Sequence, residues 1–381
     1  MHLKILPDIS HPEKKSFKAL HPMFTYDVPP TPPDIKEKFA KAQNFVVIGI
    51  GGSTIPLKVF LDVAELNDHV HIVETVDSCR WKKVKHLKDV LFCVVSKSGE
   101  TLEIKTLLGE LVTEKLLDRT IAITDPAKGS LRKFASENKI PTLDIPSDIG
   151  GRFTNFTPFH RALLERFGIR FTDLMEHAKK VSESLKKDSS ILEKLFIQTF
   201  KSSKENLILW AYGERFAGLA SWVQQVVAES LGKKTNAGKR VGIFPIVLKG
   251  PEDQHSVLQL LMDGPQRNAF WFFVPDSSDG QVKRNLPEPL KELNRLSMDQ
   301  ILNVLAESTI KTFEERLGHS ETLQPLSVFT LRGMEDVVEA ITVVQAFIEY
   351  AGEKLEVSAF DQPGVERGKQ IAREIIKKLS S

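Results

Sequence analysis

The segment 44–56 constrains the fold of this chain more than any other, because an apolar run there leads into a glycine-rich turn. Residues 45–48 are all apolar and predict a strand buried on both faces, as in a parallel sheet. Residues that suit a tight turn and a helix start follow directly: Gly49, Gly51, Gly52, Ser53 and Thr54. Such an arrangement can hold an anion, because backbone N–H groups approach it closely and the helix dipole favours negative charge.

Two common nucleotide-binding motifs do not fit this turn. A dinucleotide fingerprint needs glycine at its first, third and sixth positions, but the sixth residue counted from Gly49 is Thr54. A P-loop needs Gly-Lys followed by Ser or Thr, and no Gly-Lys pair in the chain is followed by either. Taken alone, the turn is therefore as typical of tight packing as of an anion site.

The composition predicts a globular protein without a broad surface for nucleic acid or membranes. A chain of 381 residues is long enough for two domains and a large core, and its net charge of +2 is near balance. Cys79 and Cys93 form neither a disulfide framework nor a metal-ligand spacing, which fits a reducing cytosol, so we expect a cytoplasmic protein. The N-terminus lacks the apolar stretch of a signal peptide, and no segment reaches membrane-spanning length.

Strand and helix patterns alternate in two series along the chain. The first series has apolar strand patterns at 45–48, 70–75, 90–96 and 120–124, with helical patterns at 57–66 and 104–115. The second has strand patterns at 206–212, 241–248, 269–274 and 326–331, with helical patterns at 212–231 and 335–350. This alternation predicts an α/β fold of two mainly parallel sheets, each flanked by helices in three layers.

The same patterns predict where the domains begin and end. The proline-rich N-terminus reads as an arm laid over the first domain, and residues 168–205 are helical and charged. We expect the following units: an N-terminal arm over 1–35, a first α/β domain over 36–175, a helical bridge over 176–205, a second α/β domain over 206–355, and a C-terminal loop and helix over 356–381.

A second loop of small residues, Ser96-Lys97-Ser98-Gly99-Glu100-Thr101, follows the predicted strand 90–96. Its hydroxyls suit the oxygens of a phosphate, each charge-assisted hydrogen bond contributing about 1.5–3 kcal/mol, although alone it also fits a capping turn. Both this loop and the glycine turn would lie at the carboxyl ends of parallel strands, where ligands bind in open α/β sheets.

Three further residues could take part in chemistry. Arg152 follows two glycines and could present a fixed fork of donors, although an arginine in such a turn is more often solvated. Helical phase places Glu229 beside Gln225 on a second face of the helix 212–231, away from its apolar face. Periodicity alone favours a solvated second face, although Trp222 on that side indicates partial burial. His255 stands near a helix start and could exchange protons near neutral pH, or could be an ordinary surface histidine.

Six segments of the chain, taken in order from about residue 44 to 371, resemble motifs of the glucose-6-phosphate isomerase family. That family is built from two sugar-isomerase (SIS-type) α/β domains. The matching segments are Gly49-Ile50-Gly51-Gly52-Ser53, Ser96-Lys97-Ser98-Gly99-Glu100-Thr101, Gly150-Gly151-Arg152-Phe153, Gln225 with Glu229-Ser230-Leu231-Gly232-Lys233, Gln254-His255-Ser256, and Asp361-Gln362-Pro363-Gly364-Val365-Glu366-Arg367-Gly368-Lys369.

The resemblance implies interconversion of glucose 6-phosphate and fructose 6-phosphate through an enediol, with no cofactor. Glu229 would move the proton between C2 and C1, and Arg152 would stabilise the enediolate. His255 and Lys369 would open the sugar ring, with the histidine reaching the site from the partner subunit of a homodimer. The residues implied in substrate binding are Gly52, Ser53, Ser96, Ser98 and Thr101 around the phosphate, Lys97 close by, and Gln225 and Gln362 at the hydroxyls.

The chain departs from the family pattern at three places and leaves two alternatives. Pro363 replaces a usual tryptophan, the second loop has a short form, and Ile55-Pro56 replaces a usual Leu-Gly. One alternative is a bifunctional glucose/mannose-6-phosphate isomerase. The other is a non-catalytic SIS sugar-phosphate sensor, which would not need Glu229, His255 and Lys369 together.

Overall fold

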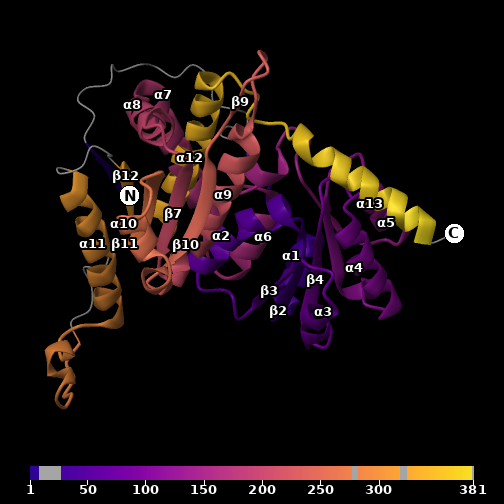
Figure 1. Ribbon diagram of the computed structural model, residues 1–381. Coiled ribbons are helices and arrows are strands. Elements are labelled where there is room, and N and C mark those ends of the chain that lie inside the picture. The colour runs from indigo at the N-terminus through magenta and orange to yellow at the C-terminus, as the bar shows by residue number, and fades with distance from the viewer. Residues whose placement is uncertain (8–26, 277–281, 318–323, 380–381) are drawn as a thin grey trace.

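The computed structural model describes residues 1–7, 27–276, 282–317 and 324–379 and contains two five-stranded sheets flanked by helices (Figure 1). Neighbouring strands are parallel throughout the first sheet and in the second except at its edge. The predicted fold class is therefore confirmed. The domain limits given above stay predictions.

The first sheet has the strand order β3-β2-β4-β5-β6. Its strands are β2 (Asn44–Ile48), β3 (Val70–Val73), β4 (Val90–Val95), β5 (Thr120–Thr124) and β6 (Thr142–Asp144). Its helices are α1 (Pro33–Lys41), α2 (Ile55–Val63), α3 (Ser78–Val84), α4 (Leu102–Thr113), α5 (Ser130–Glu137) and α6 (Pro158–Arg166). Because β3 and β4 lie on opposite sides of β2, the strand order reverses between β2 and β4, which is where such sheets bind ligands.

The second sheet has the order β1-β12-β11-β7-β10. Its strands are β1 (His2–Leu6), β7 (Asn206–Tyr212), β10 (Phe244–Gly250), β11 (Asn268–Pro275) and β12 (Leu326–Leu331). Its helices are α9 (Ala217–Leu231), α10 (Leu258–Asp263), α11 (Met298–Leu317) and α12 (Met334–Lys354). The strand predicted at 241–248 is divided, because Arg240–Val241 is β9 and pairs with β8 (Lys233–Lys234) instead of joining this sheet.

The position of the N-terminal arm differs from the prediction. We expected residues 1–35 to lie over the first domain, but β1 pairs antiparallel with β12 at the edge of the second sheet. Farther along, Asp27 forms an ion pair with Lys179, and Arg161 donates a hydrogen bond to the Val28 carbonyl at 2.8 Å. The part of the arm at 8–26 lies outside the described residues.

Three apolar cores separate the layers. One face of the first sheet packs against α3, α4 and α5, and one face of the second sheet packs against α10 and α11. The other faces of both sheets border a single continuous core that also contains α2, α6, α9 and α12. The helices α7 (Phe171–Lys187) and α8 (Ser190–Phe196) add to this middle layer by packing against α12. The shared core fixes the two sheets relative to each other.

A close contact between α2 and α9 joins the two halves. The Gly218 amide, near the start of α9, donates a hydrogen bond of 2.7 Å to Oδ2 of Asp62 on α2. A Cβ atom at Gly218 would lie 2.7 Å from the Lys58 carbonyl carbon, so the helices approach at a position where only glycine fits. Burial raises the pKa of Asp62, against the lowering effect of its hydrogen bonds with Asn67 and Gly218. The contact sets the direction in which α9 presents its polar face.

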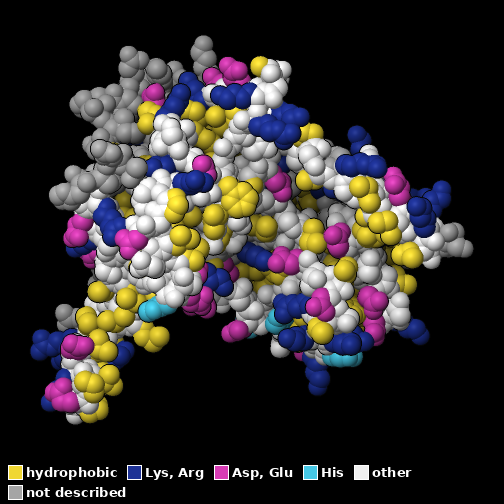
Figure 2. Space-filling model, viewed as in Figure 1, with side chains coloured by type: hydrophobic (Ala, Val, Ile, Leu, Met, Phe, Trp, Pro, Cys, Tyr) yellow, Lys and Arg dark blue, Asp and Glu magenta, His cyan; other side chains and the backbone are white. Residues whose placement is uncertain are grey.

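The last element, α13 (Glu366–Leu379), runs along the surface on the side of α4 and α5 (Figure 1). The described side chains of α13 are exposed, except that of Ala372, which is half-buried; the side chain of Glu366 is not described. Positive and negative side chains are interspersed over the face shown in Figure 2, in keeping with the small net charge. None of the helices in the described ranges is long and apolar enough to cross a membrane.

Candidate active site

The glycine turn after β2 lies directly against the turn that carries Arg152. The turn η2 (Gly51–Ser53) leads into α2, and η4 (Gly151–Phe153) contacts it. Thr154 Oγ1 donates a hydrogen bond of 3.1 Å to the Gly52 carbonyl. Within the described part of the chain, Ser53 Oγ has no hydrogen-bond partner and stays available to a ligand.

The second loop forms a tight turn at the end of β4 and is held by its own hydroxyl groups. Ser96 Oγ accepts a hydrogen bond of 3.1 Å from the Gly99 amide, and Ser98 Oγ accepts one of 3.2 Å from the Glu100 amide. Gly99 has a φ of +67°, and a Cβ atom there would lie 2.4 Å from the Leu131 nitrogen. Thr101, directly before α4, makes no capping hydrogen bond through its side chain. The hydroxyls of this loop retain protons that they can donate to an anion.

Lys97 fastens the second loop to the segment before Arg152. Its Nζ donates hydrogen bonds of 2.9 Å to the Ser147 carbonyl and 2.6 Å to the Ile149 carbonyl. Burial lowers the pKa of Lys97, and the nearby carboxylates of Asp125 and Asp148 act in the opposite direction. Lys97 thus places its amino group near the loop, and the hydrogen bonds of that group go to protein carbonyls.

Arg152 is buried, with 2% of its surface exposed, and every N–H group of its guanidinium has an acceptor. The acceptors are Ser230 Oγ at 2.8 Å from Nε, Glu229 Oε2 at 3.4 Å and Gln362 Oε1 from Nη1, and the carbonyls of Ala359 at 2.7 Å and Asp361 at 3.0 Å from Nη2. Burial lowers the pKa of Arg152, while the charges of Glu229 and Asp361 raise it. The interpretation of Arg152 as a solvated residue of a surface turn is therefore wrong.

The second face of α9 is turned toward Arg152 and the glycine turn. Trp222 is fully buried, and its Nε1 donates a hydrogen bond of 2.8 Å to the Arg152 carbonyl. Gln225 Nε2 donates a hydrogen bond of 3.1 Å to Glu229 Oε1, and a Cβ atom at Gly51 would lie 3.4 Å from the same Nε2. The prediction of a solvated face, which periodicity favoured, is therefore wrong, because residues from the first half of the chain contact this face.

Gln225 also has an unused acceptor. Its Oε1 is buried and has no hydrogen-bond partner among the described residues. An unpaired buried carbonyl is costly unless a ligand or water satisfies it. The side chain of Glu229, which lies beside Gln225, is 37% exposed, so its carboxylate remains accessible.

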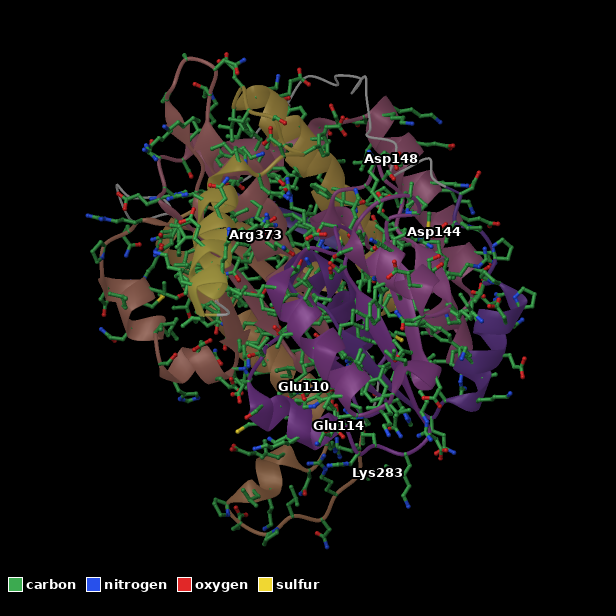
Figure 3. The ribbon with its side chains drawn as sticks, turned by 90° about the vertical axis from the view of Figure 1, so that its right-hand side faces the viewer. Glu110, Glu114, Asp144, Asp148, Lys283 and Arg373 are labelled. Carbon is green, nitrogen blue, oxygen red and sulfur yellow. The ribbon has the colours of Figure 1, made fainter. Side chains whose placement is uncertain are left out.

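Not all of the predicted catalytic residues meet in this cluster. The structure brings together Arg152, Glu229, Gln225, Gln362 and the glycine turn. His255, at the end of η7 (Glu252–His255), is exposed and lies outside this hydrogen-bonded cluster. Lys369 is also exposed, on α13, the surface helix on which Figure 3 labels Arg373.

Four residues that contribute to the cluster were not predicted as site residues. Ser230, Trp222, Asp361 and Lys233 all make hydrogen bonds to Arg152 or to the segment that follows α12. Helical phase placed Trp222 on the same face as Glu229, which was a usable signal. Ser230, Lys233 and Asp361 stood within motifs of the resemblance, but no local property of the sequence distinguished their side chains.

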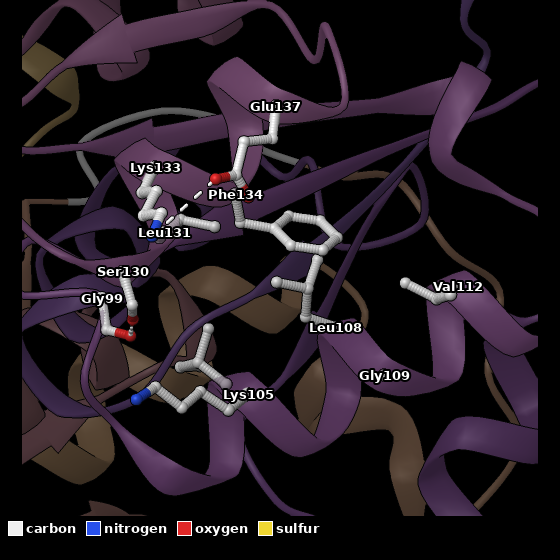
Figure 4. A pocket seen from close by; sticks show the side chains of 11 residues that line it. Gly99, Lys105, Leu108, Gly109, Val112, Ser130, Leu131, Lys133, Phe134 and Glu137 are labelled. Carbon is white, nitrogen blue, oxygen red and sulfur yellow. Dashed lines mark hydrogen bonds and ion pairs between the residues drawn. The ribbon is translucent and has the colours of Figure 1, made fainter.

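A cavity of about 370 Å³ between α4 and α5 lies apart from this cluster (Figure 4). Its walls are mainly apolar and include Ile104, Leu108, Leu131 and Phe134, with Lys105 and Lys133 at its edge. Gly99 of the second loop contributes to its lining, but none of the residues predicted to contact substrate does. Within the described ranges, no group of three or more His, Cys, Asp or Glu side chains is arranged to hold a metal ion.

The solved structures similar to this chain share its fold. A hypothetical protein from Thermus thermophilus has a TM-score of 0.80 at 28% identity, covering 90% of this chain and 86% of that chain. A glucose-6-phosphate isomerase from Chlamydia trachomatis has a TM-score of 0.71 at 19% identity, covering 91% and 72%. Tagatose-6-phosphate ketose/aldose isomerase from Escherichia coli has a TM-score of 0.54 at 13% identity, covering 87% and 88%. The fold is that of the phosphosugar isomerases.

The sequence comparisons define the family within that class. No model of a protein family matches the chain. The chain is 30% identical over 366 residues to glucose-6-phosphate isomerase of Campylobacter jejuni, covering 88% of this chain and 85% of that protein. It is 28% identical over 377 residues to the enzyme of Carboxydothermus hydrogenoformans, covering 90% and 80%. The chain belongs to the glucose-6-phosphate isomerase family.

Proposed function

We propose that this protein interconverts glucose 6-phosphate and fructose 6-phosphate through an enediol intermediate, as an enzyme of glycolysis and gluconeogenesis. The observation that carries the proposal is the pairing of Glu229 with Arg152 beside the glycine turn after β2. A carboxylate and a buried cation meet there with Nη1 3.4 Å from Oε2. That pair suits a reaction in which a base removes a carbon-bound proton while negative charge develops on an adjacent oxygen.

Glu229 is the base in this mechanism. In the open-chain aldose its carboxylate removes the proton from C2, the C1–C2 enediol forms, and the same carboxylic acid returns a proton to C1. The hydroxyl proton on O2 is lost as O1 gains one, so the aldehyde becomes a hydroxyl and C2 becomes a ketone without any oxidant. Gln225 holds one carboxylate oxygen at 3.1 Å, which orients the other oxygen toward Arg152.

Arg152 stabilises the enediolate. Its Nε and Nη2 hydrogen bonds go to Ser230 and to backbone carbonyls, which fix the plane of the guanidinium. Its Nη1 hydrogen bonds go to Glu229 and Gln362, the two groups proposed to face the substrate. An enediolate oxygen would replace Glu229 or Gln362 as an acceptor at Nη1, while the rest of the cation stays in place because its other hydrogen bonds hold it.

The phosphate end of the substrate belongs at the two loops of the first sheet. Gly52 and Ser53 follow β2, and Ser96, Ser98 and Thr101 follow the adjacent β4, at the point where the strand order reverses. Binding energy from the phosphate can hold the sugar while the groups at its other end react. Lys97 adds positive charge, and the unpaired Gln225 Oε1 can accept a hydrogen bond from a sugar hydroxyl.

Ring opening is assigned to His255 and Lys369 by the family resemblance. Both are exposed in the single chain, and we propose that a homodimer completes the site by bringing His255 from the partner subunit. We also propose that the enzyme acts in the cytoplasm. The free thiols of Cys79 and Cys93 fit a reducing compartment.

A coupled assay tests the proposal directly. The purified protein, supplied with fructose 6-phosphate and an excess of chelator, should form glucose 6-phosphate, which a dehydrogenase then reports as reduced nicotinamide cofactor. Absence of conversion would refute the proposed reaction. Mannose 6-phosphate, supplied in place of fructose 6-phosphate, is the comparison substrate, and formation of glucose 6-phosphate from it at an equal rate would point to a bifunctional enzyme.

A further inference from the structure

The segment from Ser358 to Gln362, between α12 and α13, is held by cations from both halves of the chain. Arg152, from the first half, donates to the carbonyls of Ala359 at 2.7 Å and Asp361 at 3.0 Å. Lys233, from the second half, donates to the same Asp361 carbonyl at 2.7 Å and also to the Ser358 carbonyl. One carbonyl oxygen thus receives hydrogen bonds from both cations.

Lys233 is well placed to hold this segment. Its side chain is only 9% exposed, whereas the Asp361 carboxylate, which accepts a further hydrogen bond of 2.7 Å, is 59% exposed. The backbone of Lys233 is fixed by pairing with Val241 between β8 and β9, directly after the buried end of α9. The hydrogen bond from Lys233 is the main cause of the lowered pKa of Asp361.

The position of this segment determines where two proposed site residues lie. Gln362 directly follows Asp361, and its Oε1 accepts a hydrogen bond from Arg152 Nη1, the nitrogen that also faces Glu229. The turn η9 (Pro363–Val365) and then α13, which carries Lys369, begin immediately afterwards. A shift of the Asp361 carbonyl would therefore move Gln362 away from the reacting end of the substrate.

We propose that Lys233 is a positioning residue of this enzyme, holding the segment from Ser358 to Asp361 so that Gln362 meets Arg152; the assignment rests on the proposed function. Lys233 does not itself touch the substrate. Its hydrogen bonds lie at the reacting end of the site, and the phosphate loops belong to the first sheet. Its loss therefore acts on kcat far more than on the KM for fructose 6-phosphate.

The test replaces Lys233 with methionine, which keeps the length of the side chain and removes its donors. We expect kcat of K233M to fall on the order of 10²-fold, because misplacement of about 1 Å costs that much, with the KM for fructose 6-phosphate nearly unchanged. K233R should recover part of the loss, because a guanidinium can still donate to Asp361. Lys85→Met is the matched control, since it removes a 2.6 Å ion pair with Glu114 on the surface.

A double-mutant cycle separates positioning from simple stabilisation. If Lys233 acts through Gln362, K233M combined with Gln362→Ala should be about as slow as the slower single variant. Multiplicative effects, or a kcat of K233M within twofold of the unchanged enzyme, would overturn the proposal. If K233M does not fold, Asp361→Ala takes its place, because it removes the side-chain acceptor that holds Lys233 against this segment; a kcat within twofold of the unchanged enzyme would likewise overturn the proposal.

Hydrogen exchange supplies a readout that does not depend on activity. Amides of 358–365 should exchange faster in K233M than in the unchanged protein, whereas those of 96–101 should not change. Unchanged exchange in 358–365 would overturn the proposal even if kcat fell. If the unchanged protein shows no isomerase activity but exchange rises as expected, the proposed function fails and the structural link from Lys233 to the segment stands.

Discussion

Gly52 lies so close to Gly151 that a Cβ atom on Gly52 would be 2.5 Å from the Gly151 carbonyl carbon and 2.6 Å from the Arg152 nitrogen. The contact joins the turn after β2 to the turn that carries the buried arginine. Real Cβ atoms do not approach backbone atoms that closely, so the two turns can meet only if position 52 has no side chain. The relative position of the proposed phosphate site and the proposed enediolate site depends on this contact.

Gly52→Ala should therefore impair both the stability and the activity of the protein. The added methyl group must push the two turns apart, which moves Arg152 relative to Ser53 and strains the backbone. We expect a lower midpoint of urea denaturation together with a loss of kcat/KM. Gly109→Ala on α4 is the matched control, because a Cβ atom there meets nothing within 4 Å. Alanine should raise the free energy of unfolding by up to about 1 kcal/mol at that helical position.

Glu229→Gln should preserve substrate binding and nearly abolish turnover. The amide keeps the size of the side chain but cannot remove a proton from carbon, so kcat should fall by about 10²–10⁴-fold. Binding of fructose 6-phosphate, measured by calorimetry, should change little, because the phosphate loops are untouched. Glu183→Gln, at an exposed position of α7, is the control. Unchanged turnover in Glu229→Gln would refute the assignment of Glu229 as the base.

Arg152→Lys should lower kcat and the free energy of unfolding together. An ammonium group cannot reach acceptors on Ser230, Glu229, Gln362 and two carbonyls at once, so some buried acceptors lose their donors. We expect roughly 10²–10³-fold lower kcat, and a loss of about 1–3 kcal/mol in the free energy of unfolding. Arg161→Lys, which disturbs an arginine bound to Glu165 and Val28, should lower stability without a comparable effect on kcat.

His160 should make the protein less stable as the pH falls below neutrality. It is fully buried between Phe60 and Phe159, and burial lowers its pKa to about 3. Between pH 6.5 and about 3 the unfolded chain binds a proton there that the folded chain does not. Stability should therefore decrease as pH falls through this range, with a slope from this one group of up to about 1.4 kcal/mol per pH unit.

Urea denaturation at pH 7 and pH 5 measures this effect. The difference in unfolding free energy between the two pH values should be smaller in His160→Gln than in the unchanged protein. The exposed His2 provides the control, since His2→Gln should leave the difference as it is. An equal pH dependence in His160→Gln and the unchanged protein would contradict the prediction.

The strands of both sheets were largely predictable from local patterns. The predicted bounds 120–124, 206–212 and 326–331 match β5, β7 and β12, because a continuous apolar run is required wherever a strand is buried on both faces. Two strands were missed for different reasons. β6 has only three residues, and β1 is a strand because it pairs with β12, more than 300 residues away.

The positions of the glycine- and hydroxyl-rich turns after β2 and β4 were also predictable, but the orientation of Glu229 was not. Glycines and hydroxyl residues directly after apolar strands indicate anion-binding turns, and parallel strands bring those turns to one edge. The helical phase of α9 defined which residues share a face with Glu229, yet it could not show what covers that face. Likewise, the buried state of Arg152 depends on acceptors up to 210 positions away in the chain.

The sequence by itself determined which segments form strands, where turns rich in glycine and hydroxyl residues follow them, and which residues can carry acid–base chemistry, because these depend on neighbours along the chain. Only the tertiary structure decided that the polar face of α9 is directed at Arg152 and that Lys233 holds the segment before α13. Those outcomes depend on contacts such as Asp62 with Gly218 and Gly52 with Gly151. The residues that meet there come from distant parts of the chain, and local patterns carry no information about their distance.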